Sequence, residues 1–346
     1  MLTTSEHVFA HTFAEALGII PRTYTYSRLV VLMDENVQKL YGKTAESFLP
    51  PHVLFTIPSG EQYKTLETCE KIWQFLYREQ IDRKALVLVI GGGVTTDLGG
   101  WVCATWKRGI RFILFPTTLM SMVDASIGGK FAVDFRLAKN LLGTFEYSEK
   151  IVCVPLFLET LSARDLKSGF AEMLKHALIA DAGYWDRLQV LPTTPKEWLS
   201  LIGRSVEIKQ SIVESDPLET GPRKALNFGH SIGHALESWA LANAVDLSHG
   251  EAVAQGMAVE AYLSIQHTGL LPQEYEKILT RLKNLNYPIK VPASVVFNDL
   301  KPFLFQDKKN EGGKLLFTQL PHLGTVKWDV EVSLPAVGEA FEKVLR

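Results

Sequence analysis

The segment ALVLVIGGGVTTDLGG, residues 85–100, joins an uninterrupted apolar run to a group of glycines. Such an apolar run is typical of a strand that is covered on both faces, as the strands of a parallel sheet are. The glycines directly after it predict a tight turn, and a helix is expected to start there. This order of strand, glycine turn and helix predicts an α/β fold built on a mostly parallel sheet.

The same alternation is found on both sides of this segment. Residues 28–32 and 52–57 are rich in β-branched and apolar residues, and each run is followed by a turn and a helical pattern. Further strands are expected at residues 111–115 and 151–154. Residues 1–155 are therefore predicted to form a Rossmann-like domain with a parallel sheet.

The pattern changes after residue 155. Ser162, followed three residues later by Asp165, predicts a helix start, and helical patterns recur to about residue 285. One short strand-like segment, KLLFTQL, follows at residues 314–320. Residues 156–346 are predicted to form a second, mainly α-helical domain.

Composition restricts the classes of function. The 346 residues carry 36 basic and 38 acidic side chains, a net charge of −2, so no overall field favours nucleic acid or an anionic membrane. Three cysteines, Cys69, Cys103 and Cys153, stand in apolar surroundings without a CxxC pair, which indicates buried thiols in a reducing compartment. Without a signal-like N-terminus or an apolar stretch of about 18 residues, a cytoplasmic protein is expected.

The glycine turn is an incomplete dinucleotide signature. The spacing Gly91-x-Gly93-x-x-Thr96 lacks the third glycine, and no acidic residue stands about 20 positions later to hold a ribose. A tight turn without a ligand is the alternative interpretation. Two further glycines inside the expected helix indicate a close approach, and Thr117 and Thr118 place hydroxyls at the carboxyl edge of the sheet, where ligands of such folds bind. Together these features favour a nucleotide.

Three histidines stand between residues 223 and 250. His230 and His234 are four apart on a helical pattern, so their side chains share one face, and His249 follows in a turn-like SHGE. With a carboxylate from elsewhere, two of them could form a catalytic zinc site with an open position. Ordinary surface or core histidines are the alternative. Gly229 and Gly233 indicate that a cofactor ring or another helix lies against the backbone.

Several cationic side chains have unusual neighbours. Those between residues 124 and 140 lie in a segment rich in glycine, alanine, valine and phenylalanine. Singly, each would be a solvated surface residue. Together they would match a substrate that carries both a phosphate and a carboxylate. The group comprises Lys130, Lys139, Lys175, Lys209, Arg223, Lys308 and Lys309.

Taken together, these motifs resemble the 3-dehydroquinate synthase family of metal- and NAD-dependent sugar phosphate cyclases. The resemblance runs almost end to end, and the order and spacing of its motifs are more specific than any one of them. It is carried by DENV (34–37), PSGEQYKTLE (58–67), GGGVTTDLGG (91–100), RGIRFILFPTTL (108–119), VDASIGGK (123–130), AKNLLGTF (138–145), GFAEMLKHALI (169–179), ALNFGHSIGHALE (225–237) and HGEAV (249–253).

The resemblance implies a role for each matching position, with NAD bound by the first domain and the metal by the second. The implied metal ligands are Glu172, His230 and His249. The positions implied to hold NAD are Asp34, Asn36, Glu61, Lys64, Gly92, Gly93, Asp97, Thr117, Thr118, Lys130, Lys139 and Thr160, with Asp124 near the nicotinamide. The implied substrate positions are Lys130, Asn140, Lys175, Lys209, Arg223, Asn227, His234 and one of Lys308 or Lys309. Arg108 matches a residue that reaches the phosphate site from the other subunit of a homodimer.

The chemistry implied by the family is a transient oxidation of 3-deoxy-D-arabino-heptulosonate 7-phosphate. NAD takes a hydride from C5, the adjacent C6 proton becomes acidic, and phosphate leaves C7. Return of the hydride, ring opening and an intramolecular aldol step then give 3-dehydroquinate. A divalent ion, zinc or cobalt, would polarise the substrate oxygens, and the cationic cluster would hold phosphate and carboxylate. The substrate's own phosphate is the implied base.

The sequence departs from the family pattern at three places. Thr96 and Ala138 stand where glycine is common, and Asp134-Phe135 replaces a typical Asn-His. These departures concern the cofactor cradle and its neighbouring loop. The competing interpretations are a sister cyclase making 2-deoxy-scyllo-inosose or a valiolone, a metal-dependent polyol dehydrogenase, and a non-catalytic nucleotide-binding module.

Overall fold

A computed structural model describes residues 4–136, 138–306 and 315–346. The chain divides into two compact units. The first comprises Met1–Leu166 and Thr193–Val206, and the second comprises Lys167–Pro192 and Glu207–Arg346. The boundary expected at residues 155/156 thus lies inside the first unit, and a short later segment returns to that unit.

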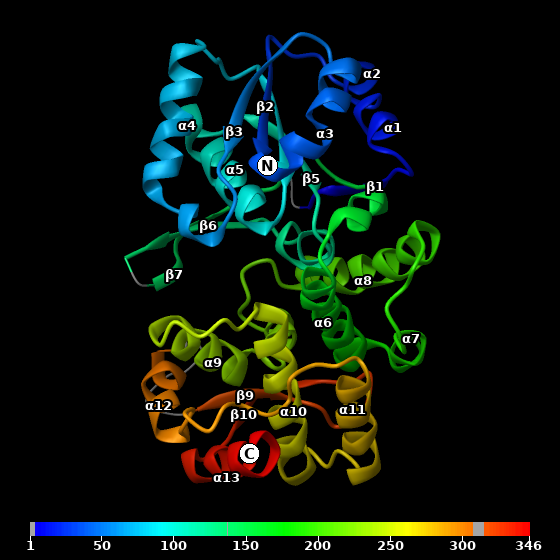
Figure 1. Ribbon diagram of the computed structural model, residues 1–346, viewed down its shortest axis with the longest axis vertical. Coiled ribbons are helices and arrows are strands. Elements are labelled where there is room, and N and C mark those ends of the chain that lie inside the picture. The colour runs from blue at the N-terminus through cyan, green and yellow to red at the C-terminus, as the bar shows by residue number, and fades with distance from the viewer. Residues whose placement is uncertain (1–3, 137, 307–314) are drawn as a thin grey trace. The chain divides into compact units, whose positions relative to one another are not determined.

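The first unit is built on a six-stranded sheet in which every recorded pair of neighbours is parallel (Figure 1). In spatial order its strands are β1 (Glu6–Phe9), β8 (Lys150–Cys153), β5 (Arg111–Pro116), β4 (Leu86–Gly91), β2 (Leu29–Asp34) and β3 (His52–Ile57). The α/β fold class is confirmed, and five of these strands lie where apolar runs predicted them. The edge strand β1 was not predicted, because its four residues, EHVF, show no long apolar run.

Helices connect and cover these strands. They are α1 (Phe13–Leu17), α2 (Ile20–Thr23), α3 (Glu35–Phe48), η1 (Glu61–Tyr63), α4 (Leu66–Arg78), α5 (Gly93–Thr105), η2 (Trp106–Arg108), η3 (Ser121–Ala125) and η4 (Pro155–Thr160). All six residues of β4 are buried, as expected for a strand covered on both faces. All three cysteines are buried free thiols, as predicted.

The glycines of α5 have a packing role. A Cβ at Gly99 would collide with the Val89 side chain of β4, and a Cβ at Gly100 would collide with the Phe131 ring. Both glycines are themselves buried. The close approach predicted for this helix is therefore an approach to the protein core, and these two glycines by themselves do not support a ligand.

A two-stranded antiparallel hairpin, β6 (Lys130–Phe135) and β7 (Ala138–Phe145), completes the first unit. No strand was expected between residues 124 and 140, so the hairpin is an element that the sequence patterns did not predict. Burial alternates at the start of β6, where Lys130 is exposed and Phe131 and Val133 are buried, but the apolar Phe135 is also exposed, which weakens the pattern visible in the sequence. Its pairing joins residues that no local apolar run marks.

The second unit is mainly helical. Its elements include most of α6 (Ala163–Ala180), α7 (Ala182–Arg187), η5 (Pro222–Asn227), α9 (His230–Ala242), α10 (His249–His267), α11 (Pro272–Asn284), α12 (Phe297–Gln306) and α13 (Leu334–Leu345), with β9 (Leu316–Gln319) antiparallel to β10 (Lys327–Glu331). Helix α8 (Pro195–Ser215) is divided, because its residues up to Val206 belong to the first unit. The predicted start of α6 is confirmed, since the Asp165 backbone N–H donates to Ser162 Oγ over 3.1 Å. In the described part of the chain, no helix is both long and apolar enough to cross a membrane.

Helices α9 and α10 pack backbone against backbone. A Cβ at Gly256 would collide with the carbonyl oxygen of Gly229, and a Cβ at Gly233 would lie 3.1 Å from the carbonyl oxygen of Ala252. Gly229 is itself left-handed, with φ of 79°. The two glycines beside the histidines thus accommodate another helix, which was one of the two expected explanations for them.

Candidate functional site

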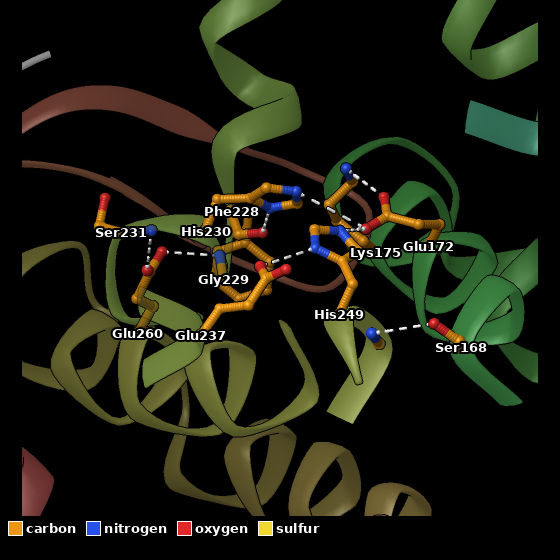
Figure 2. Close-up of polar contacts among 11 residues, drawn as sticks. Ser168, Glu172, Lys175, Phe228, Gly229, His230, Ser231, Glu237, His249 and Glu260 are labelled. Atoms are coloured by element: carbon orange, nitrogen blue, oxygen red, sulfur yellow. Dashed lines mark hydrogen bonds and ion pairs between the residues drawn. The ribbon is translucent and has the colours of Figure 1, made fainter. Parts of the chain in front are cut away.

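The three predicted metal ligands lie together in the second unit (Figure 2). Glu172 comes from the buried face of α6, and its Oε1 lies 3.6 Å from His230 Nε2 and 3.4 Å from His249 Nε2. One ligand atom from each residue lies within 4.8 Å of the other two. Side chains 77 positions apart in sequence therefore meet at one point, as a shared metal ion requires.

His230 is fixed by the backbone that precedes it. It is the first residue of α9, and its Nδ1 lies 3.1 Å from the Phe228 carbonyl oxygen. A carbonyl oxygen can only accept, so Nδ1 carries the proton and donates it. The other nitrogen, Nε2, is then left as a lone-pair donor on the side of Glu172.

His249 is the first residue of α10 and lies in a helix start, which corrects the expectation of a simple turn. Ser248 Oγ accepts from the Glu251 backbone N–H, and the Glu251 carboxylate accepts from the Ser248 N–H over 2.8 Å, which forms a complete capping box. His249 Nδ1 lies 3.1 Å from Glu237 Oε2. The Gly250 N–H donates to Ser168 Oγ over 3.1 Å, so α6 also holds this helix start.

The charges in the trio shift one another strongly. Burial by itself would raise the pKa of the Glu172 carboxyl, but Lys175 and His249 outweigh it and hold the pKa well below its usual range. For His249, burial lowers the pKa, while the adjacent Glu172 and Glu237 carboxylates raise it to about 10. Without a metal ion these two groups are a carboxylate and an imidazolium.

The donor set fits a divalent transition metal. Among the described residues, neither oxygen of Glu172 makes a hydrogen bond of good geometry, although the Lys175 ammonium is within ion-pair distance. A fully buried carboxylate oxygen without such a bond is costly unless a cation binds it. Two imidazoles and one carboxylate are ligands of catalytic zinc, whose fourth position stays open.

The third histidine of the motif lies beside the other two. The His234 ring is centred 5.0 Å from the His230 ring and 6.2 Å from the His249 ring. It is exposed, and with Glu237 and His249 it forms a second group whose ligand atoms lie within 4.8 Å of one another. Because His249 belongs to both groups, the two cannot bind separate metal ions at the same time. The group that contains the buried Glu172 carboxylate is the better metal site.

The predicted cations of this unit are buried rather than solvated. Lys175 is 1%, Arg223 is 3% and Lys209 is 6% exposed. Since lysine and arginine are rarely buried without a partner, the surface interpretation of these three residues is wrong. Arg223 is held by its turn: its backbone N–H donates to Asp216 Oδ2 over 3.1 Å, and its Nη1 donates to the Pro217 carbonyl over 2.6 Å.

A carboxylate that sequence reasoning missed lies next to Asn227. The Asn227 side-chain amide donates to Glu219 Oε1 over 2.8 Å. Glu219 has φ of 62°, a left-handed conformation that is rare for a residue with a side chain. An acidic residue in such a turn belongs to no helical or strand pattern, so no sequence signal marks it.

In the first unit, three predicted residues form one polar cluster. Lys64 Nζ lies 2.6 Å from Asp97 Oδ2 and donates to Asn140 Oδ1 over 2.5 Å. Burial raises the pKa of Asp97 to about 6, even though Lys64 opposes the shift. The Lys64 pKa is also raised: burial lowers it, but Asp97 more than compensates. The cluster thus joins two residues expected to hold NAD with one expected to hold substrate.

The glycine turn and the end of β5 lie side by side. The Thr117 N–H donates to the Gly91 carbonyl over 2.9 Å, and a Cβ at Gly92 would lie 2.9 Å from Thr118 Cγ2. Gly92 is the N-cap of α5 and provides no side-chain acceptor there. The first N–H groups of α5 are thus left without a side-chain cap, as in helix termini that bind phosphates.

Thr96, one of the three departures, does not obstruct this turn. Its hydroxyl donates to the Gly93 carbonyl over 3.0 Å, and the residue is fully buried inside the unit. Asp134, another departure, accepts from the Asn140 N–H over 2.8 Å. It therefore orders the hairpin next to Lys64, since the Asp134 N–H donates to the Lys64 carbonyl over 2.9 Å.

The remaining predicted positions are spread over the first unit. Asp34 caps α3 by accepting from the Asn36 N–H over 2.8 Å, and Lys139 Nζ lies 3.6 Å from Glu61 Oε1. Thr160 donates to the Phe157 carbonyl over 3.0 Å. Asp124 lies in η3, Lys130 begins β6, and Arg108 ends η2 with φ of 65°. Lys308 and Lys309 lie outside the described residues.

Comparison with known families decides the relationship of the chain. Residues 54–168 match the family described as 3-dehydroquinate synthase N-terminal, and residues 169–310 match 3-dehydroquinate synthase C-terminal. The chain belongs to the 3-dehydroquinate synthase family. It is 37% identical to the 3-dehydroquinate synthase of Parabacteroides distasonis over 92% of this chain and 91% of that one. It is 36% identical to that of Symbiobacterium thermophilum, over 98% and 97%.

Solved structures support the family fold. The 2-epi-5-epi-valiolone synthase of Streptomyces hygroscopicus, solved with NAD+ and Zn2+, is 28% identical with a TM-score of 0.87, over 98% of this chain and 96% of that chain. A 2-deoxy-scyllo-inosose synthase with NAD+ and Co2+ has the same TM-score at 22% identity, over 98% and 96%. The latter likeness shows the fold alone. The resemblance inferred from the motifs is confirmed.

Proposed function

We propose that this chain catalyses the 3-dehydroquinate synthase reaction, which converts 3-deoxy-D-arabino-heptulosonate 7-phosphate to 3-dehydroquinate and phosphate. The observation that carries this proposal is the convergence of Glu172, His230 and His249 in a chain of this family. The enzyme is a phosphate-eliminating lyase. We place it in the cytoplasm as a homodimer, with Arg108 serving the partner's phosphate site.

The second unit, with residues 156–346 as the proposed domain, would hold the metal. Glu172, His230 and His249 are its proposed ligands, with zinc or cobalt as the ion. When bound, the ion polarises substrate hydroxyl oxygens and lowers their pKa. Glu237 supports the site, because it fixes the His249 ring through Nδ1 and leaves Nε2 for the metal.

The first unit, with residues 1–155 as the proposed domain, would hold NAD, which supplies a reversible hydride acceptor. The start of α5 at Gly92 and Gly93 offers backbone N–H groups to the pyrophosphate. Asp97 and Lys64, largely buried and 2.6 Å apart, would line the proposed NAD site. The other proposed NAD contacts are Asp34, Asn36, Glu61, Thr117, Thr118, Lys130, Lys139 and Thr160, with Asp124 at the nicotinamide.

The cationic residues would bind the two anionic ends of the substrate. Lys175, Lys209 and Arg223 are buried, so their charges are only weakly screened by water. Fixed cations of this kind orient phosphate and carboxylate before reaction, which removes an entropic barrier. The remaining proposed substrate contacts are Lys130, Asn140, Asn227 and His234.

The experiment that tests this function is an assay of phosphate release with three substrates: the heptulosonate 7-phosphate, glucose 6-phosphate and sedoheptulose 7-phosphate. Turnover of the first, lost with a chelator and restored by Zn2+ or Co2+, is the expected result. Turnover of only the second or third would identify a sister cyclase. Net NADH accumulation with a simple polyol would instead identify a dehydrogenase, because a cyclase returns its hydride.

Two variants distinguish the effect of a change in the proposed site from that of a change elsewhere in the protein. His230→Ala removes a proposed metal ligand and is expected to abolish phosphate release. Lys39→Ala removes an exposed ion pair with Glu35 in the first unit and is expected to leave turnover unchanged. Wild-type turnover by the His230 variant would contradict the proposed metal centre.

A further inference from the structure

Helix α9 begins with a proposed metal ligand but has no side-chain cap of its own. Its N-cap is Gly229, and His230 is the first helical residue. The start is enclosed: His230 is 8%, Ser231 is 7% and Ile232 is 0% exposed. Because the first N–H groups of a helix have no partner within the helix, this buried start needs acceptors from elsewhere.

Glu260 of α10 provides these acceptors (Figure 2). Its Oε2 accepts from the Gly229 N–H over 2.7 Å, and its Oε1 accepts from the N–H groups of Ser231 and Ile232 over 3.1 and 3.3 Å. Glu260 is fully buried. A carboxylate with both oxygens accepting, placed at the positive end of a helix, compensates its own burial.

The same contacts control the ring of His230. Its Nδ1 donates to the carbonyl of Phe228, so the orientation of the ring depends on the backbone from 228 to 230. Gly229 lies in the middle of that segment with φ of 79°, a left-handed conformation that glycine adopts readily because it has no Cβ. The missing Cβ also leaves the backbone less restricted at this position. The hydrogen bond from the Gly229 N–H to Glu260 restricts the backbone at this position instead.

Helix α10 therefore serves both histidines of the trio. His249 begins this helix, and Glu260 follows three turns later on it. Between them, Gly256 brings α10 against the Gly229 carbonyl. A single rigid helix thus carries one proposed metal ligand and the group that positions the other.

We propose that Glu260 is a positioning residue of the metal centre, whose carboxylate holds the first turn of α9 so that His230 Nε2 points to the metal. This inference rests on the proposed function only in that the trio binds a divalent ion. Glu260 itself is not a ligand, since its oxygens are used by backbone N–H groups.

The test is the metal affinity of Glu260→Gln, measured by competition with a chromophoric chelator for Zn2+ and for Co2+. Glutamine keeps the volume but presents an NH2 donor to at least one of the three N–H donors. Loss of a group that orients a metal ligand typically weakens affinity about 10- to 100-fold, and this is the expected result. The visible spectrum of bound Co2+ should also change, while NAD affinity should not.

Glu260→Asp is the conservative companion. It keeps the charge and both acceptor oxygens but shortens the side chain, so an affinity between those of the wild type and Glu260→Gln is expected. If the glutamine variant does not fold, the aspartate variant alone decides: wild-type metal affinity and an unchanged Co2+ spectrum would overturn the proposal.

Ser264→Ala is the matched control. Ser264 is fully buried on the same helix, donates to the Glu260 backbone carbonyl over 2.7 Å and accepts from the Leu320 N–H over 3.0 Å. Its removal should lower the unfolding temperature without changing metal affinity. A Glu260→Gln protein that is destabilised in the same way but binds metal as the wild type does would show a purely structural role and overturn the proposal. A wild-type protein that binds neither ion would instead refute the metal centre.

Discussion

Two buried carboxylates, each beside a lysine, behave in opposite ways in the two units. In the second unit, Glu172 pairs with Lys175, and its pKa is held well below the usual range. In the first unit, Asp97 pairs with Lys64 at 2.6 Å, yet its pKa rises to about 6. Each is a carboxyl group paired with a lysine ammonium, and the usual pKa values of Asp and Glu differ little, so the difference must come from the surroundings.

The surroundings differ in the charge that faces each carboxylate. For Asp97, burial is the largest influence, Lys64 opposes it, and the acidic Glu61 and Asp124 add to the rise in pKa. Around Glu172, Lys175 is joined by His249 and His176, which together exceed the effect of burial. A lysine partner alone therefore does not decide the state of a buried carboxyl group.

The largest effect is expected from Glu172→Gln. This change removes a proposed metal ligand and leaves Lys175 buried beside an amide, and breaking a buried ion pair typically costs about 3–5 kcal/mol. Chelator competition should show metal affinity lowered at least about 100-fold, and calorimetry should show a lower unfolding temperature. Retention of one metal ion at wild-type affinity would disprove the assignment of this carboxylate.

Gly256→Ala should be the next most disruptive change. The added Cβ would collide with the Gly229 carbonyl, so α9 and α10 must separate, and overpacking of this kind costs about 1–3 kcal/mol. Because these helices carry His230 and His249, metal affinity should fall with stability.

The control for this variant is Gly203→Ala in α8, where a Cβ would have no neighbour within 4 Å. That change should be neutral or stabilise the protein by about 0.5–1 kcal/mol, since alanine is the better helix former. Equal unfolding temperatures for the two variants would show that the close packing of α9 and α10 is unimportant.

Metal binding should depend on pH through His249. Its pKa is raised to about 10, so below that pH the ring is protonated on both nitrogens, whereas a metal needs Nε2 free. Binding should therefore release about one proton, and affinity should rise about tenfold per pH unit up to about pH 10. Titration calorimetry in buffers of different ionisation enthalpy measures the released proton; a binding enthalpy independent of buffer would contradict the assignment.

The smallest effect is expected in the pH dependence of stability of the metal-free protein, which compares the Asp97 and Glu172 carboxyl groups directly. Asp97 titrates higher in the folded chain than in the unfolded chain, so its ionisation opposes folding as pH rises from about 4 to 6. Relative to Asp97→Asn, the wild type should gain on the order of 1 kcal/mol as pH falls through this range. For Glu172 the sign reverses: the wild type should lose stability relative to Glu172→Gln as pH falls below about 4.5. Chemical denaturation across this pH range measures both slopes, and parallel slopes would refute the contrast.

Much of the fold was predictable because its signals are local. Five sheet strands follow from apolar runs, and the start of α6 follows from Ser162 and Asp165. The hairpin β6–β7 and the helices α12 and α13 were missed. Helix α12 contains Pro302, which normally argues against a helix, and the hairpin is stabilised by pairing across strands rather than by its own pattern.

The sequence by itself indicated the parallel sheet through its apolar runs and the family through the order and spacing of its motifs, and the resemblance to that family implied the three residues of the candidate metal centre. Only the tertiary structure decided what surrounds them. In the sequence, Glu260 has the pattern of an ordinary helix residue, yet its carboxylate accepts from backbone N–H groups 28 to 31 positions away. Glu237 similarly orients His249 from another helix. Such groups are close in space but far apart in the sequence, so no local sequence pattern reveals them. Burial strengthens their interactions.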